Sequence, residues 1–134
     1  MLLIAAYHSS LLACTVLAGL IFVQVLIADL AGMMAKHVPG MPVTDGHSSF
    51  FFRAHRAHAN TNENLGLFLL LLVTAILLGA SPRWVNGAAW VFTAARAAHM
   101  ALYYGKQGGA RGIAFGTGLF AQATLLVACI AALL

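Results

Sequence analysis

A short polar segment inside a very apolar chain holds most of the side chains that can do chemistry. It occupies residues 53–64 and leads directly into an almost wholly apolar run at 65–80. Each charge costs roughly 2.5–3.5 kcal/mol at the middle of a bilayer. A helix turns by about 100° per residue, which places these side chains on one face: Arg53, Arg56, Asn60 and Glu63. This face is therefore predicted to lie against other helices, water or a polar ligand.

A second polar face repeats the same spacing further along the chain. Its members are Arg96, His99, Tyr103 and Lys106. Glu63 is the only acidic residue on either face, so a single carboxylate stands against several cations. The surplus of positive charge predicts a bound anion. We expect one with carboxylates, because arginine binds these groups in a planar, bidentate manner.

A structural interpretation of the same charges is also open. In it, Arg53 or Arg96 pairs with Glu63 and fixes the packing of the helices, while the other long basic side chains reach the membrane interface. The ligand-site interpretation follows from the general rule that ionisable residues inside a membrane are functional. Spacing alone does not separate the two.

The composition predicts an integral membrane protein. The chain has 134 residues, of which 62% are hydrophobic and 7% charged, whereas a soluble domain carries about 25% charged residues. The length fits a single domain, 1–134. The net charge of +4 is not arranged as a basic patch with interleaved aromatic side chains, so no nucleic-acid partner is expected.

Four long helices are expected to make up the chain. Apolar runs that suit a bilayer span of about 20 residues alternate with polar or glycine- and proline-rich breaks. The expected helices occupy residues 5–36, 49–79, 83–106 and 113–134. Short connections favour antiparallel neighbours, so the predicted fold is all-α: an integral membrane antiparallel four-helix bundle. Asp45 or Ser48 is expected to cap the second helix.

The distribution of basic residues predicts the orientation in the membrane. Lysines and arginines collect at the first and third connections, and only Arg83 lies at the second. By the positive-inside rule the first and third connections face the cytoplasm, so both termini lie outside. We expect a bacterial inner membrane. Asp29, near the cytoplasmic end of the first helix, is expected either to pair with a basic residue or to lie in interfacial water.

Metal and haem chemistry finds little support in the sequence. No Gly-x-Ser-x-Gly, Walker-type or His-Glu-x-x-His motif occurs. His37 and His47 fall in the first loop and are expected to be solvated, without metal-ligand spacing. His55 and His58 lie on the side of the second helix away from the arginines, so neither haem nor a metal is expected. The isolated cysteines are predicted to be buried free thiols: Cys14 and Cys129.

Two motifs resemble those of a known membrane family. RAHRAHANTNENL at 53–65 is similar to the second-helix signature of the MAPEG proteins, the membrane-associated proteins in eicosanoid and glutathione metabolism. ARAAHMALYYGK at 95–106 is similar to their third-helix signature. The order and length of the helices also resemble the microsomal glutathione transferases of this family. The resemblance implies a homotrimer of four-helix subunits, with glutathione bound between neighbouring subunits near the cytoplasmic side.

The resemblance also implies roles for individual residues. Arg111 matches the arginine that activates the glutathione thiol. Arg53 and Arg96 match positions that either bind glutathione or brace its site. The other matched positions contact glutathione from the second and third helices: Arg56, Asn60, Glu63, His99 and Tyr103.

The implied chemistry is a transferase or peroxidase reaction with glutathione as co-substrate. A thiol with a pKa of about 8.5 is a better nucleophile at neutral pH when a cation stabilises its thiolate. The thiolate then attacks a lipophilic electrophile or reduces a hydroperoxide, which arrives through the membrane lipids. Two departures from the family pattern, Ala59 and Phe115, remove an anion contact and a hydroxyl that several members have.

Two other functions remain open. A non-catalytic protein of the same fold would bind glutathione or a lipid anion through the polar faces. A small transporter would need a titratable acid deep in the bilayer. Asp29 and Glu63 both lie toward the cytoplasmic side, which disfavours transport.

Overall fold

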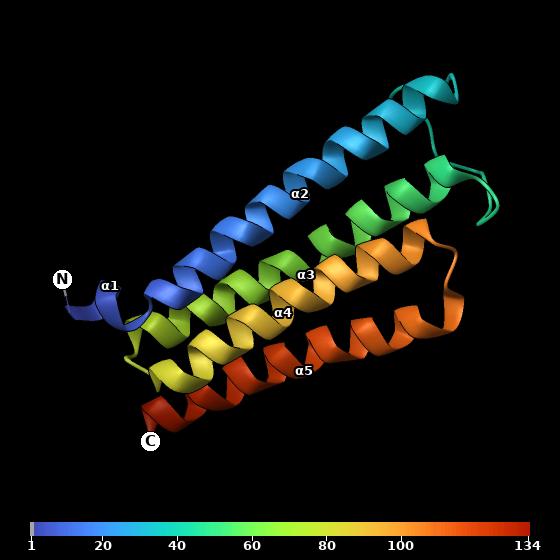
Figure 1. Ribbon diagram of the computed structural model, residues 1–134. Coiled ribbons are helices and arrows are strands. Elements are labelled where there is room, and N and C mark those ends of the chain that lie inside the picture. The colour runs from blue at the N-terminus through green and yellow to red at the C-terminus, as the bar shows by residue number, and fades with distance from the viewer. Residues whose placement is uncertain (1) are drawn as a thin grey trace.

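Five helices and no strand make up residues 2–134, the part of the chain that the computed structural model describes. A short helix precedes four long ones (Figure 1): α1 (Leu2–Ala6), α2 (His8–Met34), α3 (Phe50–Leu77), α4 (Pro82–Tyr104) and α5 (Gly108–Leu133). The all-helical prediction is thus confirmed for these residues. The four predicted long helices correspond to α2 through α5, with shifted ends.

The long helices lie side by side, and successive ones run in opposite directions (Figure 1). Helices α3 and α4 form the centre of the packing, because each contacts three of the long helices: α2, α5 and the other member of the central pair. Both ends of the chain lie at the same end of the molecule (Figure 1). The polar segment 53–64 is therefore on a central helix, at the end away from the termini.

The core consists of apolar side chains where α3 and α4 meet their neighbours. The rings of Phe68 and Phe92 stack at 4.0 Å with 4° between their planes, and neither is exposed to solvent. Leu17 from α2 and Leu125 from α5 close the cluster from either side. Each of the four long helices thus contributes to one apolar cluster in the half of the molecule nearer the termini.

Three of the long helices have the length and apolar composition to cross a membrane: α2, α3 and α5. Their outward side chains include Phe22, Leu70 and Phe120, which are 64%, 66% and 71% exposed. Large apolar side chains on an outer surface suit contact with lipid rather than water. Helix α4 is not among the three by composition, although four apolar spans were predicted.

Two helix ends near the N-terminal half differ from the prediction, and the start of α5 differs as well. The first helix is broken at Tyr7, whose buried hydroxyl donates to the backbone oxygen of Ala80. Ser49, rather than Asp45 or Ser48, caps α3 by accepting from a backbone N–H at 3.3 Å.

The turn between α4 and α5 is much tighter than the predicted loop of residues 105–112. Lys106 adopts a left-handed conformation with φ 63°, and the N–H of Gln107 reaches back to the oxygen of Leu102 at 2.9 Å. This arrangement ends α4 and reverses the chain at once, so α5 begins at Gly108. Arg111 is consequently in the first turn of a helix and not in a loop.

Candidate functional site

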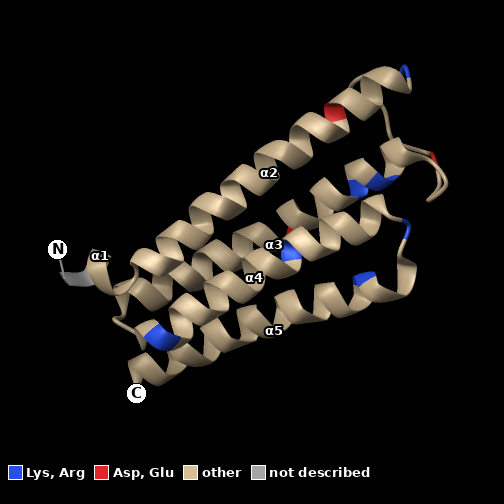
Figure 2. Ribbon diagram, in the orientation of Figure 1, with Lys and Arg blue, Asp and Glu red and all other residues tan. Residues whose placement is uncertain are grey.

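Most of the basic residues lie in the half of the molecule away from the chain termini (Figure 2). Helices α3, α4 and α5 and the α4–α5 turn bring five of them to this region: Arg53, Arg56, Arg96, Lys106 and Arg111. We call these five the cationic cluster. Arg83, in the first turn of α4, lies at the opposite end. The two polar faces predicted from spacing therefore do meet, with α5 adding its arginine to them.

Arg96 is the most deeply buried member of the cluster, with 1% of its surface exposed. Its Nη1 donates to Oδ1 of Asn60 at 3.0 Å. The guanidinium carbon lies 5.4 Å from the ring centre of Phe92 and 5.7 Å from that of Phe115. Within residues 2–134, its Nε has no hydrogen-bond partner and no carboxylate pairs with it. A buried cation without a neutralising anion is costly, so this position favours an anionic ligand.

Gly118 on α5 provides the space for the Arg96 side chain. A Cβ at this position would lie 2.6 Å from Nη2 of Arg96 and 3.2 Å from its Cζ. No real Cβ tolerates the shorter of these distances. The glycine therefore determines where the guanidinium can lie, a role that the sequence did not reveal, because helix spacing alone does not show which glycine faces which arginine.

Glu63 pairs with Arg56, and not with Arg53 or Arg96 as the alternative structural interpretation supposed. The closest oxygen and nitrogen are 3.8 Å apart, and the side chains are 56% and 41% exposed. Such an exposed pair contributes about 0–1 kcal/mol. The only acid of the two faces therefore leaves the buried arginines, Arg53 and Arg96, unneutralised.

Arg53 is buried but points at the loop between α2 and α3. Its Nη1 donates to the backbone oxygens of His47 and Ser48, at 2.8 and 2.9 Å. Its guanidinium carbon also lies 5.5 Å from the ring centre of Phe50. Of the two roles that the resemblance implied for this residue, these contacts match bracing.

His99, Tyr103 and Arg111 form a continuous row across α4 and α5. The rings of His99 and Tyr103 are 5.0 Å apart, and His99 is 4% exposed. The guanidinium carbon of Arg111 lies 4.3 Å above the ring centre of Tyr103, a favourable cation–π distance. Phe115, 6.4 Å from His99, closes the row with an apolar ring.

A pocket of about 360 Å³ opens between this row and the α2–α3 loop. We call it the loop-end pocket. It is lined by basic and polar groups and by no acid of the described chain: His47, Ser48, Arg53, Lys106, Gly108 and Arg111. His47 is exposed, as predicted, but it also contacts Arg111, with Nδ1 and Nη1 3.3 Å apart. Its position in a long loop gave no spacing from which this contact could be predicted.

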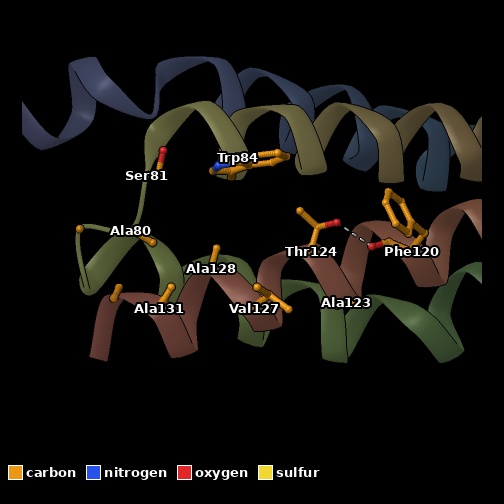
Figure 3. Close-up of a pocket in the computed structure, with 11 residues that line it drawn as sticks. Ala80, Ser81, Trp84, Phe120, Ala123, Thr124, Val127, Ala128 and Ala131 are labelled. Carbon is orange, nitrogen blue, oxygen red and sulfur yellow. Dashed lines mark hydrogen bonds between the residues drawn. The ribbon is translucent and has the colours of Figure 1, made fainter. Parts of the chain in front are cut away.

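Two larger hollows are apolar. One of about 640 Å³ lies near the chain termini, far along α5 from Arg111, with Trp84 projecting from α4 and Thr124 and Val127 from α5 (Figure 3). The other, of about 520 Å³, runs between α4 and α5 and reaches Ala110 and Ile113, the neighbours of Arg111 in the first turns of α5. This second hollow is an apolar groove that includes none of the cationic cluster in its lining and ends at the same turns of α5 that carry Arg111.

The remaining candidate groups lie outside the site. Asp29 and His55 are exposed on their helices, and neither pairs with a charged group within residues 2–134. Cys14 is half-buried and Cys129 is buried, and both are free thiols. No group of metal-ligating side chains occurs in the described part of the chain.

Comparison with known proteins identifies the family. The sequence matches the MAPEG family over residues 10–131, which includes all four long helices almost completely. No curated protein and no solved structure gives a significant match to the chain. The motif resemblance at residues 53–65 and 95–106 is thus confirmed by a match along nearly the whole length. The chain belongs to the MAPEG family and is an integral membrane protein of the glutathione- and eicosanoid-metabolism class.

Proposed function

We propose that this protein is a glutathione-dependent membrane transferase or peroxidase that acts on lipophilic electrophiles or hydroperoxides. The observation that carries the proposal is the burial of Arg96 without a carboxylate partner in residues 2–134, inside a cluster of five basic residues. Family membership supplies the class of anion. Glutathione has two carboxylates and one ammonium group, which suits several cations around one acid.

The polar faces would divide the charged groups of glutathione between them. Arg56, Asn60 and Glu63 lie along α3, and Glu63 is the only acid among them. Its exposed pair with Arg56 would be exchanged for the ammonium group. His99 and Tyr103 would contact the peptide from α4. Arg53 and Arg96 would hold the site in shape through the bonds described above, with Arg96 also attracting a carboxylate.

Arg111 is the residue that we assign to thiol activation. Its guanidinium lies over the ring of Tyr103 and contacts Nδ1 of His47 through Nη1. The remaining N–H groups of the guanidinium would be available to the thiol. A cation beside the thiol lowers the pKa of that thiol, and each unit corresponds to about 1.4 kcal/mol. The thiolate sulfur would then bond to an electrophilic carbon as the leaving group departs, or attack a peroxide oxygen as the O–O bond breaks.

The second substrate would reach the thiolate through the apolar groove between α4 and α5. This groove would open toward the lipid, because Ile113 in its lining is exposed, and it reaches Ala110 and Ile113, on either side of Arg111 in the sequence. A lipophilic molecule dissolved in the bilayer would find an apolar path in the groove. The polar co-substrate and the apolar one would thus approach from different sides.

The proposed assembly is a homotrimer of antiparallel four-helix bundles, with glutathione bound between neighbouring subunits. The four long helices would be the four spans, with the cationic cluster on the cytoplasmic side and both termini outside, in a bacterial inner membrane. Support comes from the concentration of basic residues at one end (Figure 2) and from the positive-inside rule.

A non-catalytic glutathione- or lipid-anion-binding protein is the second candidate. Phe115 favours it, because its ring lies 5.7 Å from the Arg96 guanidinium and 6.4 Å from His99 without offering a hydroxyl. A hydroxyl at this place would donate to a thiolate. The two candidates share the binding site. They differ in whether a glutathione thiol is activated there and, for a lipid anion, in the ligand.

A glutathione titration of the detergent-solubilised protein tests the proposal. Ligand at about 100 times its Kd stabilises a protein by about 2.7 kcal/mol, so we expect a clear rise of the thermal unfolding temperature. The Arg111→Ala variant should keep that rise but lose at least about tenfold of the thiolate absorbance at neutral pH, the effect of one pKa unit. Arg83→Ala, at the opposite end, is the matched control.

Each result separates the two candidates. Absence of any thermal shift of the unmodified protein with glutathione contradicts the catalytic proposal and the binding of glutathione, and leaves only a protein that binds a lipid anion. Binding without thiolate absorbance or turnover contradicts the catalytic proposal and leaves the binding protein. Full turnover by Arg111→Ala contradicts the role of Arg111 in thiol activation and excludes the non-catalytic candidate.

A further inference from the structure

The last residues of the α2–α3 loop are fixed against the loop-end pocket. The buried guanidinium of Arg53 holds the backbone oxygens of His47 and Ser48 at 2.8 and 2.9 Å. The next residue, Ser49, caps α3 through its bond of 3.3 Å to the N–H of Phe52. The bonds from Arg53 and the cap at Ser49 therefore fix the backbone of His47 and of the two residues that follow it.

The imidazole of His47 has a defined setting, although it is exposed. Its ring meets Phe52 of α3 edge-on, with centres 5.0 Å apart and 82° between the planes. It stacks on Tyr103 of α4 at 6.1 Å and 26°. These contacts direct Nδ1 at the Arg111 guanidinium of α5, 3.3 Å away. One loop side chain thus joins three helices.

The contact with Arg111 determines which ring nitrogen of His47 carries the proton. A guanidinium has only donors and keeps its charge throughout the physiological range. Nδ1 must therefore be the acceptor, and the ring is neutral with its proton on Nε2. A proton added to Nδ1 would remove the acceptor and place a second positive charge beside Arg111.

The surroundings of His47 would not neutralise that added charge. Tyr103 contributes a neutral phenol, and Asp45, two residues earlier, lines a separate hollow near the end of α2. The charged groups that line the same pocket are all positive, and they come from α3, the α4–α5 turn and α5: Arg53, Lys106 and Arg111.

We propose that His47 is a positioning residue whose neutral imidazole holds the Arg111 guanidinium over Tyr103 and whose protonation releases it. The inference rests on the proposed role of Arg111 toward the glutathione thiol. In the held position Arg111 uses one N–H toward His47 and keeps the others for the loop-end pocket. A proton on Nδ1 would remove the acceptor for this N–H, so thiol activation would be withdrawn when His47 is protonated.

Three variants distinguish the effect of the hydrogen-bond acceptor of His47 from the effect of its aromatic ring. His47→Asn keeps an acceptor oxygen close to the place of Nδ1 but does not titrate. His47→Phe keeps the aromatic stacking and has no acceptor. His37→Phe is the matched control, because His37 lies in the same loop but bonds to the backbone oxygen of Met41 at 3.0 Å, away from the loop-end pocket.

The first measurement reports on Arg111 without glutathione. An arginine-specific dicarbonyl reagent is applied to the full chain in detergent, and the labelling of Arg111 is divided by that of exposed Arg83. Release of one hydrogen bond should raise this ratio about fivefold between about pH 8 and pH 5. His47→Phe should show the high ratio at both pH values, His47→Asn the low ratio at both, and His37→Phe the unmodified behaviour.

The second measurement is the thiolate absorbance of bound glutathione over the same pH range. His47→Asn should retain thiolate at lower pH than the unmodified protein, and His47→Phe should lose it at every pH. A labelling ratio that is independent of pH and equal in all variants overturns the role of His47, whatever glutathione does. Failure of the unmodified protein to bind glutathione overturns the proposed function instead, and the labelling ratio alone then decides whether His47 holds Arg111.

Discussion

The space that Gly118 leaves for Arg96 can be tested by filling it with one methyl group. In Gly118→Ala the new Cβ would lie 2.6 Å from Nη2, 3.2 Å from Cζ and 3.4 Å from Nε of Arg96. The atoms in its way belong to the far end of a flexible side chain, so the guanidinium should move and the helices should stay. The displaced group would lose its bond of 3.0 Å to Asn60 and its place between the rings of Phe92 and Phe115.

Two opposing contributions determine the effect of Gly118→Ala on stability. A hydrogen bond to a charged group is worth about 1.5–3 kcal/mol. Replacing a helical glycine by alanine returns about 0.5–1 kcal/mol. We expect the free energy of unfolding to fall by about 1–2 kcal/mol. Gly116→Ala is the matched control two residues earlier on α5. Gly116 is exposed and nothing lies within 4 Å of its Cβ, so this change should be stabilising.

A double-mutant cycle identifies the cause. The four proteins are the unmodified chain, Gly118→Ala, Arg96→Met and the double variant, and unfolding is followed by the fluorescence of Trp84 and Trp90. Methionine has no guanidinium, so in its presence the alanine should stabilise by about 0.5–1 kcal/mol, as in a free helix. An equal loss from Gly118→Ala with and without Arg96 would refute the steric explanation.

Two further changes test the chain reversal and the N-terminal break. Lys106→Gly should raise the free energy of unfolding by about 1 kcal/mol, because a side chain at φ 63° is strained. Lys36→Gly, at φ 55°, should have the same effect. Thermal unfolding measures both, and no gain in either variant would contradict this explanation. Tyr7→Phe should cost about 1–3 kcal/mol by leaving the backbone oxygen of Ala80 without its donor, and unchanged thermal unfolding together with unchanged proteolysis near α1 would exclude this role.

The sequence was sufficient to predict the long helices because each consists of a continuous, largely apolar run of residues. Runs of apolar residues and the breaks between them mark α2 through α5 to within a few residues at most ends. The largest error lies at the start of α5, where three glycines at 108, 109 and 112 suggest a loop. Glycine merely permits that loop, whereas the tight turn at Lys106 lets α5 begin at once.

The candidate site was predictable where it depends on periodicity along one helix. The faces of α3 and α4 place Asn60 opposite Arg96, and this pair is in contact at 3.0 Å. Their partners across longer distances were not predictable from spacing. Arg53 bonds to the loop and Glu63 pairs with Arg56. Several partners lie within reach of each of these side chains, and the side-chain rotamer and the nearby backbone acceptors determine which one is used.

Arg96 explains why the site requires contributions from all parts of this end of the molecule. A buried guanidinium with one amide partner is stable only if its position is enforced, because any freedom would let it reach solvent. Gly118 provides the space, Asn60 the acceptor and two aromatic rings the sides. The charge is thus held where no acid of residues 2–134 reaches it. The protein keeps an unneutralised cation in place, and a carboxylate ligand would gain the attraction that an internal ion pair would otherwise have used.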